Sequence, residues 1–188
     1  MKRLFLQSLR LTLVFTILVG VIYPLAITGV ARLAFRGKAN GSLIERDGKI
    51  IGSELLAQQF QGAKYFWARP SAGGYATVPS GASNLGPTSA ALQSNVLANA
   101  KAFRDGNKLP ADALVPADMV FTSGSGLDPH ISPEAARLQI NRVAFERKLS
   151  ADQLSAVVEK LIEPPQFGFL GEPRVNVLLL NLALDQRK

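Results

Sequence analysis

Leu11–Ala31 reads LTLVFTILVGVIYPLAITGVA, a run of 21 residues without a charged side chain. As a helix this run would span about 32 Å, enough to cross a hydrocarbon core of roughly 30 Å. Arg10 and Arg32 mark its two ends. A cleaved signal peptide is the alternative, because Gly29-Val30-Ala31 is an acceptable small-residue cleavage site. The run is longer than the apolar region of a signal peptide, so we expect a retained transmembrane helix.

The helix divides the chain into a tail (1–10), a linker (32–41) and a domain (42–188). Basic residues flank it equally on both sides, so the positive-inside rule gives a tie; they are Lys2, Arg3, Arg10, Arg32, Arg36 and Lys38. Because a short tail most simply stays inside while a long domain is exported, we predict a cytoplasmic tail and an extracytoplasmic domain.

Charge is distributed unevenly along the chain. There are 21 Lys and Arg against 14 Asp and Glu, a net charge of +7, and the six residues that flank the helix carry most of it. The domain itself is close to neutral, which argues against a nucleic-acid partner and for a membrane protein. The absence of Cys excludes disulfides and thiolate metal sites.

Within the helix, small or helix-perturbing residues recur at four-residue spacing. They form one stripe along which another membrane helix could approach closely: Thr16, Gly20, Pro24 and Thr28. We predict that this stripe contacts a partner helix. The alternative is that Gly, Pro and Thr are simply common in membrane helices.

The rest of the chain predicts one compact α+β domain. Asp47-Gly48 between apolar-containing runs predicts a hairpin of Leu43–Arg46 and Lys49–Ile51. Strands are expected at Lys64–Trp67 and Met119–Thr122, and helices at Glu54–Phe60 (after an N-cap at Ser53), 89–104, 133–148 (after Ser132) and from the capping box Ser150–Gln153. Residues 175–184 fit both helical and alternating periodicity, and their length favours a helix.

The sequence does not contain a convincing autonomous active site. Ser125, Asp128 and His130 have the residue types of a hydrolase triad, but they lie within six residues, whereas triad partners usually come from separate segments. One His without Cys is a weak basis for a metal site. The Ser-Gly-Ser-Gly stretch before a helix could face a phosphate, yet the chain has no P-loop motif. We therefore predict neither catalytic residues nor a metal.

Four stretches resemble the C subunit of the bacterial Kdp potassium-transporting ATPase. They are Tyr65–Ser71 (YFWARPS), Ser83–Thr88 (SNLGPT), Ser123–Pro133 (SGSGLDPHISP) and Gly168–Val177 (GFLGEPRVNV). The resemblance implies a bacterial inner-membrane complex for high-affinity potassium uptake. Its other members would be a channel-like potassium-binding subunit, a P-type ATPase subunit and a small single-helix subunit.

In that family the C subunit is described as an assembly factor and as a catalytic chaperone that raises the ATP affinity of the ATPase subunit. The chain lacks the D-K-T-G-T phosphorylation motif, so the resemblance implies a non-catalytic subunit with no cofactor of its own and ATP supplied through the ATPase subunit. The stretch Ala135–Ala144 matches a family segment whose glutamine, here Gln139, has been linked to nucleotide binding. The alternative is a solvated helix face.

Two loops are the predicted subunit interfaces, because both are rich in Gly, Pro and small polar residues. The candidate residues are Arg69, Pro70, Asn84 and Gly86 in the Arg69–Thr88 loop, and Ser123, Gly124, Ser125, Gly126, Asp128 and His130 in the Ser123–Pro133 loop. These loops could instead be rigid turns that support the fold. A different function remains open as well: a membrane-anchored extracytoplasmic binding module or serine hydrolase that uses the 123–133 loop.

Overall fold

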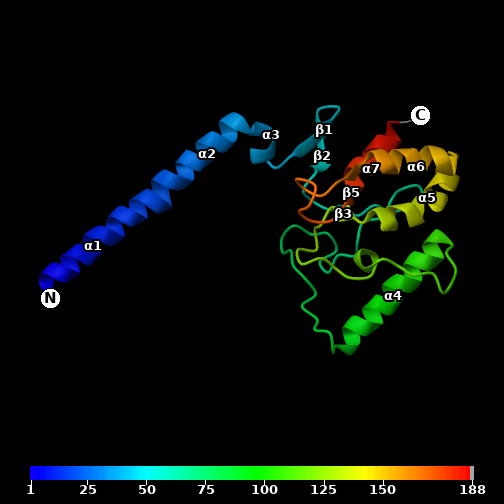
Figure 1. Ribbon diagram of the computed structural model, residues 1–188, viewed down its shortest axis with the longest axis horizontal. Helices are drawn as coiled ribbons and strands as arrows, with labels where there is room; N and C mark the ends of the chain where they lie inside the picture. The colour runs from blue at the N-terminus through cyan, green and yellow to red at the C-terminus, as the bar shows by residue number, and fades with distance from the viewer. Residues whose placement is uncertain (187–188) are drawn as a thin grey trace. The chain divides into compact units, whose positions relative to one another are not determined.

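The computed structural model describes residues 1–186 and contains two compact units, Met1–Ser53 and Glu54–Lys188 (Figure 1). The hairpin that the sequence places in the domain belongs to the first unit. The second unit contains the helices and the small sheet that carry the candidate loops.

The first unit begins with one continuous apolar helix. It consists of α1 (Lys2–Ile17), a π-helical turn η1 (Leu18–Ile22) and α2 (Tyr23–Ala34). These 33 residues are long and apolar enough to cross a membrane, and no side chain in their most apolar stretch is buried. The predicted span Leu11–Ala31 lies within this helix, so the expectation of a single N-terminal apolar helix is confirmed across residues 1–186.

The π-helical turn lies beside the proline of this helix. Pro24 lacks a backbone N–H and occupies the first turn of α2, directly after η1. A missing donor and a bulky ring disturb the preceding turn of a helix, and a wider turn is one way to accommodate them. Gly20, at the centre of η1, adds no side chain that would resist the change.

A short helix and a hairpin complete the first unit. After α3 (Arg36–Ala39), β1 (Leu43–Arg46) pairs antiparallel with β2 (Lys49–Ser53). Asp47 and Gly48 both have positive φ, 52° and 70°, which a type I′ turn requires. The hairpin prediction is therefore confirmed, with a bulge between Ile44 and Glu45.

The second unit combines helices with a three-stranded antiparallel sheet of order β3-β5-β4. Helix α5 is central to the second unit, because it packs against α4, α6 and β5. The predicted fold class, an α+β domain that follows one apolar helix in the chain, is confirmed. The elements are α4 (Ala90–Asn107), a 3₁₀ turn η2 (Ala117–Met119), β3 (His130–Ile131), α5 (Pro133–Arg147), α6 (Ala151–Lys160), β4 (Ile162–Glu163), β5 (Arg174–Asn176) and α7 (Val177–Asp185).

Side-chain caps determine where the helices begin. The Ser132 hydroxyl accepts a hydrogen bond from Ala135 N at the start of α5. At α6 the predicted capping box is present, since Ser150 accepts from Gln153 N and Gln153 accepts from Ser150 N. Each such cap satisfies backbone donors that the first helical turn leaves open.

The predicted helix Glu54–Phe60 is wrong. These residues form turns and irregular chain. Ser53, the expected N-cap, ends β2 opposite Leu43 and donates its hydroxyl hydrogen to Gly41 O at 2.6 Å. Ala57 N donates to Leu127 O, a bond with a distant segment that replaces helical pairing.

The predicted strand Lys64–Trp67 is also wrong, although its backbone is tightly bound. Phe66 N donates to Asn181 Oδ1 at 2.8 Å, and the Asn181 amide donates back to Phe66 O at 2.9 Å. Gln139 does the same for Trp67. Two side-chain amides thus take the place of a neighbouring strand.

Of two further expectations, the strand at Met119–Thr122 is wrong and the helix at 175–184 is confirmed over most of its length. Met119–Thr122 is no strand, because successive turn hydrogen bonds after Pro116 form η2. Residues 175–184 contain both periodicities: β5 ends at Asn176, whose side chain accepts from Leu179 N and caps α7. The predicted helix is therefore confirmed only from Val177 onward.

Gly106 in α4 allows a close approach that no other residue permits. A Cβ atom at this position would overlap the indole ring of Trp67. In an open helix position Gly→Ala stabilises by up to about 1 kcal/mol. Overlap with a packed ring makes the Gly→Ala substitution destabilising instead, since overpacking costs about 1–3 kcal/mol.

We therefore predict that Gly106→Ala lowers the free energy of unfolding by about 1–3 kcal/mol. Urea unfolding in detergent, followed by the fluorescence of the single tryptophan, measures this change. Gly37→Ala is the control, since nothing lies within 4 Å of the added Cβ. Equal stability of the two variants would contradict the close packing of Trp67 on α4.

Candidate functional site: two loops joined by a polar network

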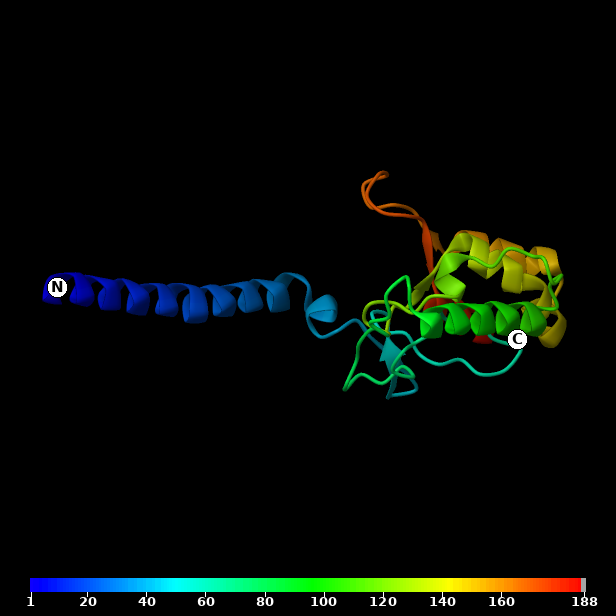
Figure 2. The ribbon, with the colours of Figure 1, turned by 90° about the horizontal axis from the view of Figure 1, so that it is seen from below.

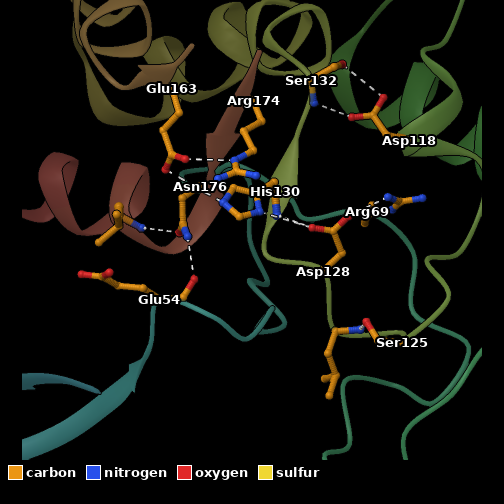
Figure 3. A network of polar contacts seen from close by, with 12 residues as sticks. Glu54, Arg69, Asp118, Ser125, Asp128, His130, Ser132, Glu163, Arg174 and Asn176 are labelled. Atoms are coloured by element: carbon orange, nitrogen blue, oxygen red, sulfur yellow. Dashed lines mark hydrogen bonds and ion pairs between the residues drawn. The ribbon is translucent and has the colours of Figure 1, made fainter. Parts of the chain in front are cut away.

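The two predicted interface loops meet through an ion pair. Arg69 Nη1, from the 69–88 loop, lies 2.7 Å from Asp128 Oδ2 of the 123–133 loop (Figure 3). Arg69 Nη2 donates to Phe121 O at 3.5 Å, and Tyr75 Oη donates to Arg69 O at 2.9 Å. The structure therefore brings Arg69, Asp128 and His130 into one cluster.

Close backbone contact joins the same loops at Gly126. This residue has φ of +69°, and an added Cβ would lie 2.9 Å from Gly81 O and 3.2 Å from Ser71 Oγ. Glycine is required here both for its conformation and for its size.

The small sheet extends the cluster toward β4. His130 on β3 lies opposite Asn176, and Glu163 on β4 lies opposite Arg174. Arg174 and Asn176 are two residues apart on β5, so they share one face of the sheet. His130 Nδ1 lies 3.4 Å from Asp128 Oδ1, its Nε2 lies 3.9 Å from Glu163 Oε1, and Glu163 accepts from Arg174 Nε at 2.9 Å.

The pKa of Asp128 reflects burial opposed by several polar partners. Partial burial raises its pKa, but the side-chain and backbone hydrogen bonds from His130 and the contact with Arg69 lower it, and the net pKa is about 2. Asp128 is therefore ionised at neutral pH and contributes favourably to folding there.

A cavity of about 500 Å³ borders this network. Its lining includes both arginines and the central histidine, Arg69, Arg174 and His130. Acidic side chains of Asp118, Asp128 and Glu172 face the same space, so the two signs of charge are mixed. Among the described residues no group of three His, Cys, Asp or Glu side chains could hold a metal ion.

The arrangement does not assemble a hydrolase triad. The Ser125 hydroxyl accepts from Leu127 N within its own turn. Both ring nitrogens of His130 face carboxylates, those of Asp128 and Glu163. A nucleophilic serine needs a hydrogen bond to the imidazole, and the geometry of the 123–133 loop gives the hydrolase alternative no support.

The remaining loop candidates lie outside the network. Asn84, Gly86 and Gly124 are exposed. Pro70 lines a separate cavity of about 520 Å³ between its loop and α4. Ser123 is buried, and its hydroxyl has no hydrogen-bond partner. Their role in subunit contacts stays a prediction.

Gln139 lies in the interior of the domain, so the solvated-face alternative is wrong. Its side chain is completely buried. The amide oxygen accepts from Trp67 N at 2.8 Å and from Arg142 Nη2 at 2.7 Å, and the amide nitrogen donates to Trp67 O and Ala135 O. A nucleotide role for Gln139 stays a prediction.

Arg142 reinforces this contact from the next helical turn. Its guanidinium stacks on Trp67 at 3.9 Å and donates to Ala63 O, Tyr65 O and Asn107 Oδ1. Burial lowers the pKa of Arg142 to about 10, so the group remains charged at neutral pH. The stack and the hydrogen bonds compensate the loss of hydration.

The predicted membrane stripe spans the π-helical turn. Thr16 lies in α1, Gly20 in η1, and Pro24 and Thr28 in α2, and all four are exposed. Residues spaced by four drift around an ideal α-helix, because a turn holds 3.6 residues. A wider turn partly compensates the drift. The stripe is therefore better aligned than in an unbroken α-helix.

Three members of the network were not predicted from the sequence: Glu163, Arg174 and Asp118. Arg174 lies within the quoted GFLGEPRVNV stretch, so a signal was present. Asp118 accepts from Ser132 N at 2.6 Å and from the Ser132 hydroxyl at 3.1 Å. Nothing in the spacing of these residues indicates that the sheet would bring them together.

The fold and the loops define a class of protein: an α+β domain joined to one apolar helix, with a polar network but no assembled catalytic triad among residues 1–186. Comparison with known proteins makes the class specific. The family described as KdpC, "K+-transporting ATPase, c chain", matches residues 5–186. The chain belongs to this family of potassium-transporting ATPase subunits.

Curated relatives support the assignment over the whole length. A protein of Mycobacterium bovis (strain BCG / Pasteur 1173P2) is 51% identical, covering 99% of this chain and 100% of the relative. One from Rhodospirillum rubrum is 53% identical with 97% of both chains covered, and one from Methylococcus capsulatus is 50% identical with 96% covered. All three are named potassium-transporting ATPase KdpC subunit.

We predict that Asp128→Asn lowers the free energy of unfolding at pH 7 by about 1–2 kcal/mol, after allowance for solvent screening. The pKa of Asp128 is lowered on folding from 3.8 to about 2, so its contribution is complete above pH 4 and is lost as the pH falls toward 2. Urea unfolding from pH 7 to pH 2 measures the difference from the wild type.

The exposed Asp112 provides the control, and Asp112→Asn should stay within about 0.5 kcal/mol of the wild type. If the difference between Asp128→Asn and the wild type were the same at pH 7 and pH 2, the carboxylate would not be stabilised by its partners.

Proposed function

We propose that the chain is a non-catalytic accessory subunit of an ATP-driven, high-affinity potassium uptake complex. It would hold together a channel-like potassium-binding subunit, a P-type ATPase subunit and a small single-helix subunit. The family match over residues 5–186 carries this proposal. The chain needs no cofactor of its own, and ATP would be bound by the ATPase subunit.

The chemistry of the chain supports an accessory role. It has no D-K-T-G-T motif to accept a phosphoryl group, and Leu11–Ala31 contains no ionisable side chain other than Tyr23. Ion pathways through a membrane normally require polar or charged groups that replace water. Both phosphoryl transfer and ion conduction are therefore assigned to the partners.

The proposed location is the bacterial inner membrane, crossed once, with a cytoplasmic N-terminus and a periplasmic domain. In this orientation the domain cannot contact cytoplasmic ATP. An effect on ATP affinity must then pass through the membrane subunits as a coupling free energy, typically 1–3 kcal/mol. The catalytic chaperone role is proposed in that indirect form.

The first test compares complexes purified in mild detergent with and without this subunit. We expect stoichiometric co-purification with the larger membrane subunits. Omission should raise the ATP concentration for half-maximal hydrolysis at least about fivefold, the lower end of ordinary coupling energies. A chain that purifies alone, with the ATPase complete and unchanged without it, would overturn the proposal.

Two variants show whether Gln139 acts in nucleotide binding or only in folding. Gln139 and Asn181 play equivalent roles, since each buried amide binds both backbone groups of one residue, Trp67 or Phe66. Gln139→Ala and Asn181→Ala should each destabilise the domain by about 2–3 kcal/mol. A nucleotide role requires that Gln139→Ala, and not Asn181→Ala, raise the ATP concentration for half-maximal hydrolysis by the assembled complex. Equal values for the two variants would exclude that role.

The orientation can be tested with single cysteines, because the chain has none of its own. Leu114 in the domain is 85% exposed, and Lys2 lies in the predicted tail. We expect a membrane-impermeant maleimide to label the Leu114→Cys variant in intact spheroplasts. The Lys2→Cys variant should react only after permeabilisation.

The reverse pattern would place the domain in the cytoplasm. Direct contact with ATP would then be possible, and the indirect coupling route would be unnecessary. Labelling of both variants in intact spheroplasts would indicate leaky cells, which a cytoplasmic marker protein controls.

A further inference from the structure

A short hairpin extends from the sheet between β4 and β5. Residues 164–173 read PPQFGFLGEP and lead away from the helices of the second unit, as the orange segment in Figure 2 shows. Its base is the β4–β5 pair, where Glu163 lies opposite Arg174 and binds it. The extension therefore begins at the edge of the polar network.

The tip of this hairpin exposes large apolar side chains. Phe167 is 78% exposed, Phe169 is 76% exposed and Leu170 is 49% exposed. The only charged side chain among residues 164–173 is Glu172. Three exposed apolar side chains within four residues, without charges between them, are unusual for a turn in contact with water.

The tip is also held in one shape. Gln166 and Leu170 exchange both backbone hydrogen bonds at 2.9 Å, and Gly168 N donates to Pro165 O at 3.0 Å. Phe167 takes a positive φ of 55°, a conformation that is uncommon for a bulky residue. Pro164, Pro165 and Pro173 restrict the two arms further. A preorganised tip loses little entropy when it is buried.

We propose that residues 166–170, here called the FGF tip, dock into an uncharged apolar recess on the extramembrane face of a partner subunit of the complex. This inference deepens the proposed function and rests on it, because it requires that such partners exist.

A contact between the tips of two copies of this chain would be too small to form a stable interface. The exposed apolar area of the three side chains is on the order of 400 Å², since a fully buried aromatic side chain covers about 150–250 Å². Two tips facing each other would bury on the order of 800 Å², below the roughly 1,200 Å² of a stable interface. The tip needs a partner that other contacts already hold nearby.

The charge of the segment argues against lipid as the occupant. Bilayer-binding segments combine apolar residues with Lys or Arg for anionic headgroups and with Trp or Tyr at the interface. The segment 164–173 contains none of these four residue types. Glu172 gives it a negative charge, which anionic headgroups repel. An uncharged protein recess is the complementary surface.

The apolar helix supplies the additional contact. It would hold this chain beside its partners in the same membrane, which makes docking of the tip an intramolecular step at high effective concentration. A contact too small to hold a free partner can then determine how the domain docks.

The experiment uses the full chain with a single cysteine at the tip. The Phe169→Cys variant is labelled with an environment-sensitive fluorophore and reconstituted in liposomes, alone and with the partner subunits. Leu114→Cys is the matched control from another exposed apolar position, 85% accessible. Soluble iodide reports exposure to water, and nitroxide-labelled lipids report contact with the bilayer.

We expect the label at position 169 to be shielded from iodide only when the partners are present, with no quenching by nitroxide lipid. Quenching by lipid would make the bilayer the occupant. Shielding without partners that increases with protein density would indicate a second copy. Full access to iodide in the assembled complex would show an undocked tip. Each of these three results would overturn the inference.

A second measurement removes the aromatic rings without straining the turn. Asn tolerates positive φ better than Phe, so Phe167→Asn is combined with Phe169→Ser. Retention of the partners should fall roughly tenfold to a hundredfold for each buried ring lost. Phe145→Ser, which removes a phenylalanine that is 72% exposed on α5, should leave retention unchanged.

The two proposals fail in different ways. If the wild-type chain does not co-purify with partner subunits, the proposed function itself is wrong. If the wild type co-purifies and the double variant is retained equally well, the function stands and the docking role of the FGF tip is wrong.

Discussion

The second unit depends on two buried amides that hold one extended segment. Gln139 of α5 and Asn181 of α7 each bind the backbone N–H and C=O of a residue in the chain 65–67. Arg142 then closes the contact by stacking on Trp67. An unpaired buried peptide group costs about 1–3 kcal/mol, so the segment has a strong preference for this one position. Removing either amide would leave two such groups without partners.

This arrangement determines where the candidate loops lie. Arg69 follows Trp67 by two residues, so the position of Trp67 aims Arg69 toward Asp128. Gly126 then allows the 123–133 loop to pack against the 69–88 loop, and the sheet adds Glu163 and Arg174 from the other side. The two loops are joined into one surface, and the charges of Arg69 and Asp128 are paired within it.

The sequence correctly predicted the elements that depend on contacts between residues close together in the chain. Asp47-Gly48 gave the hairpin, and Ser150 with Gln153 gave the start of α6, because the partners lie within a few residues. The prediction failed at Lys64–Trp67, where the partner of Phe66 is 115 residues away. A β-propensity pattern shows that a segment is extended, but it does not show what satisfies its backbone. The Arg69–Asp128 pair was missed as a contact for the same reason, although both residues were candidates.

A domain built in this way suits a subunit that acts through the shape of its docking surface. Arg69, Arg147 and Arg174 each have an acidic partner inside the domain, so a docking subunit need not supply countercharges or strip water from isolated ions. An accessory subunit influences a distant site only as far as its contacts differ between two states of its partners. A surface whose arginines are already paired makes such contacts without breaking ion pairs of its own. That property suits the proposed indirect effect on the ATPase subunit.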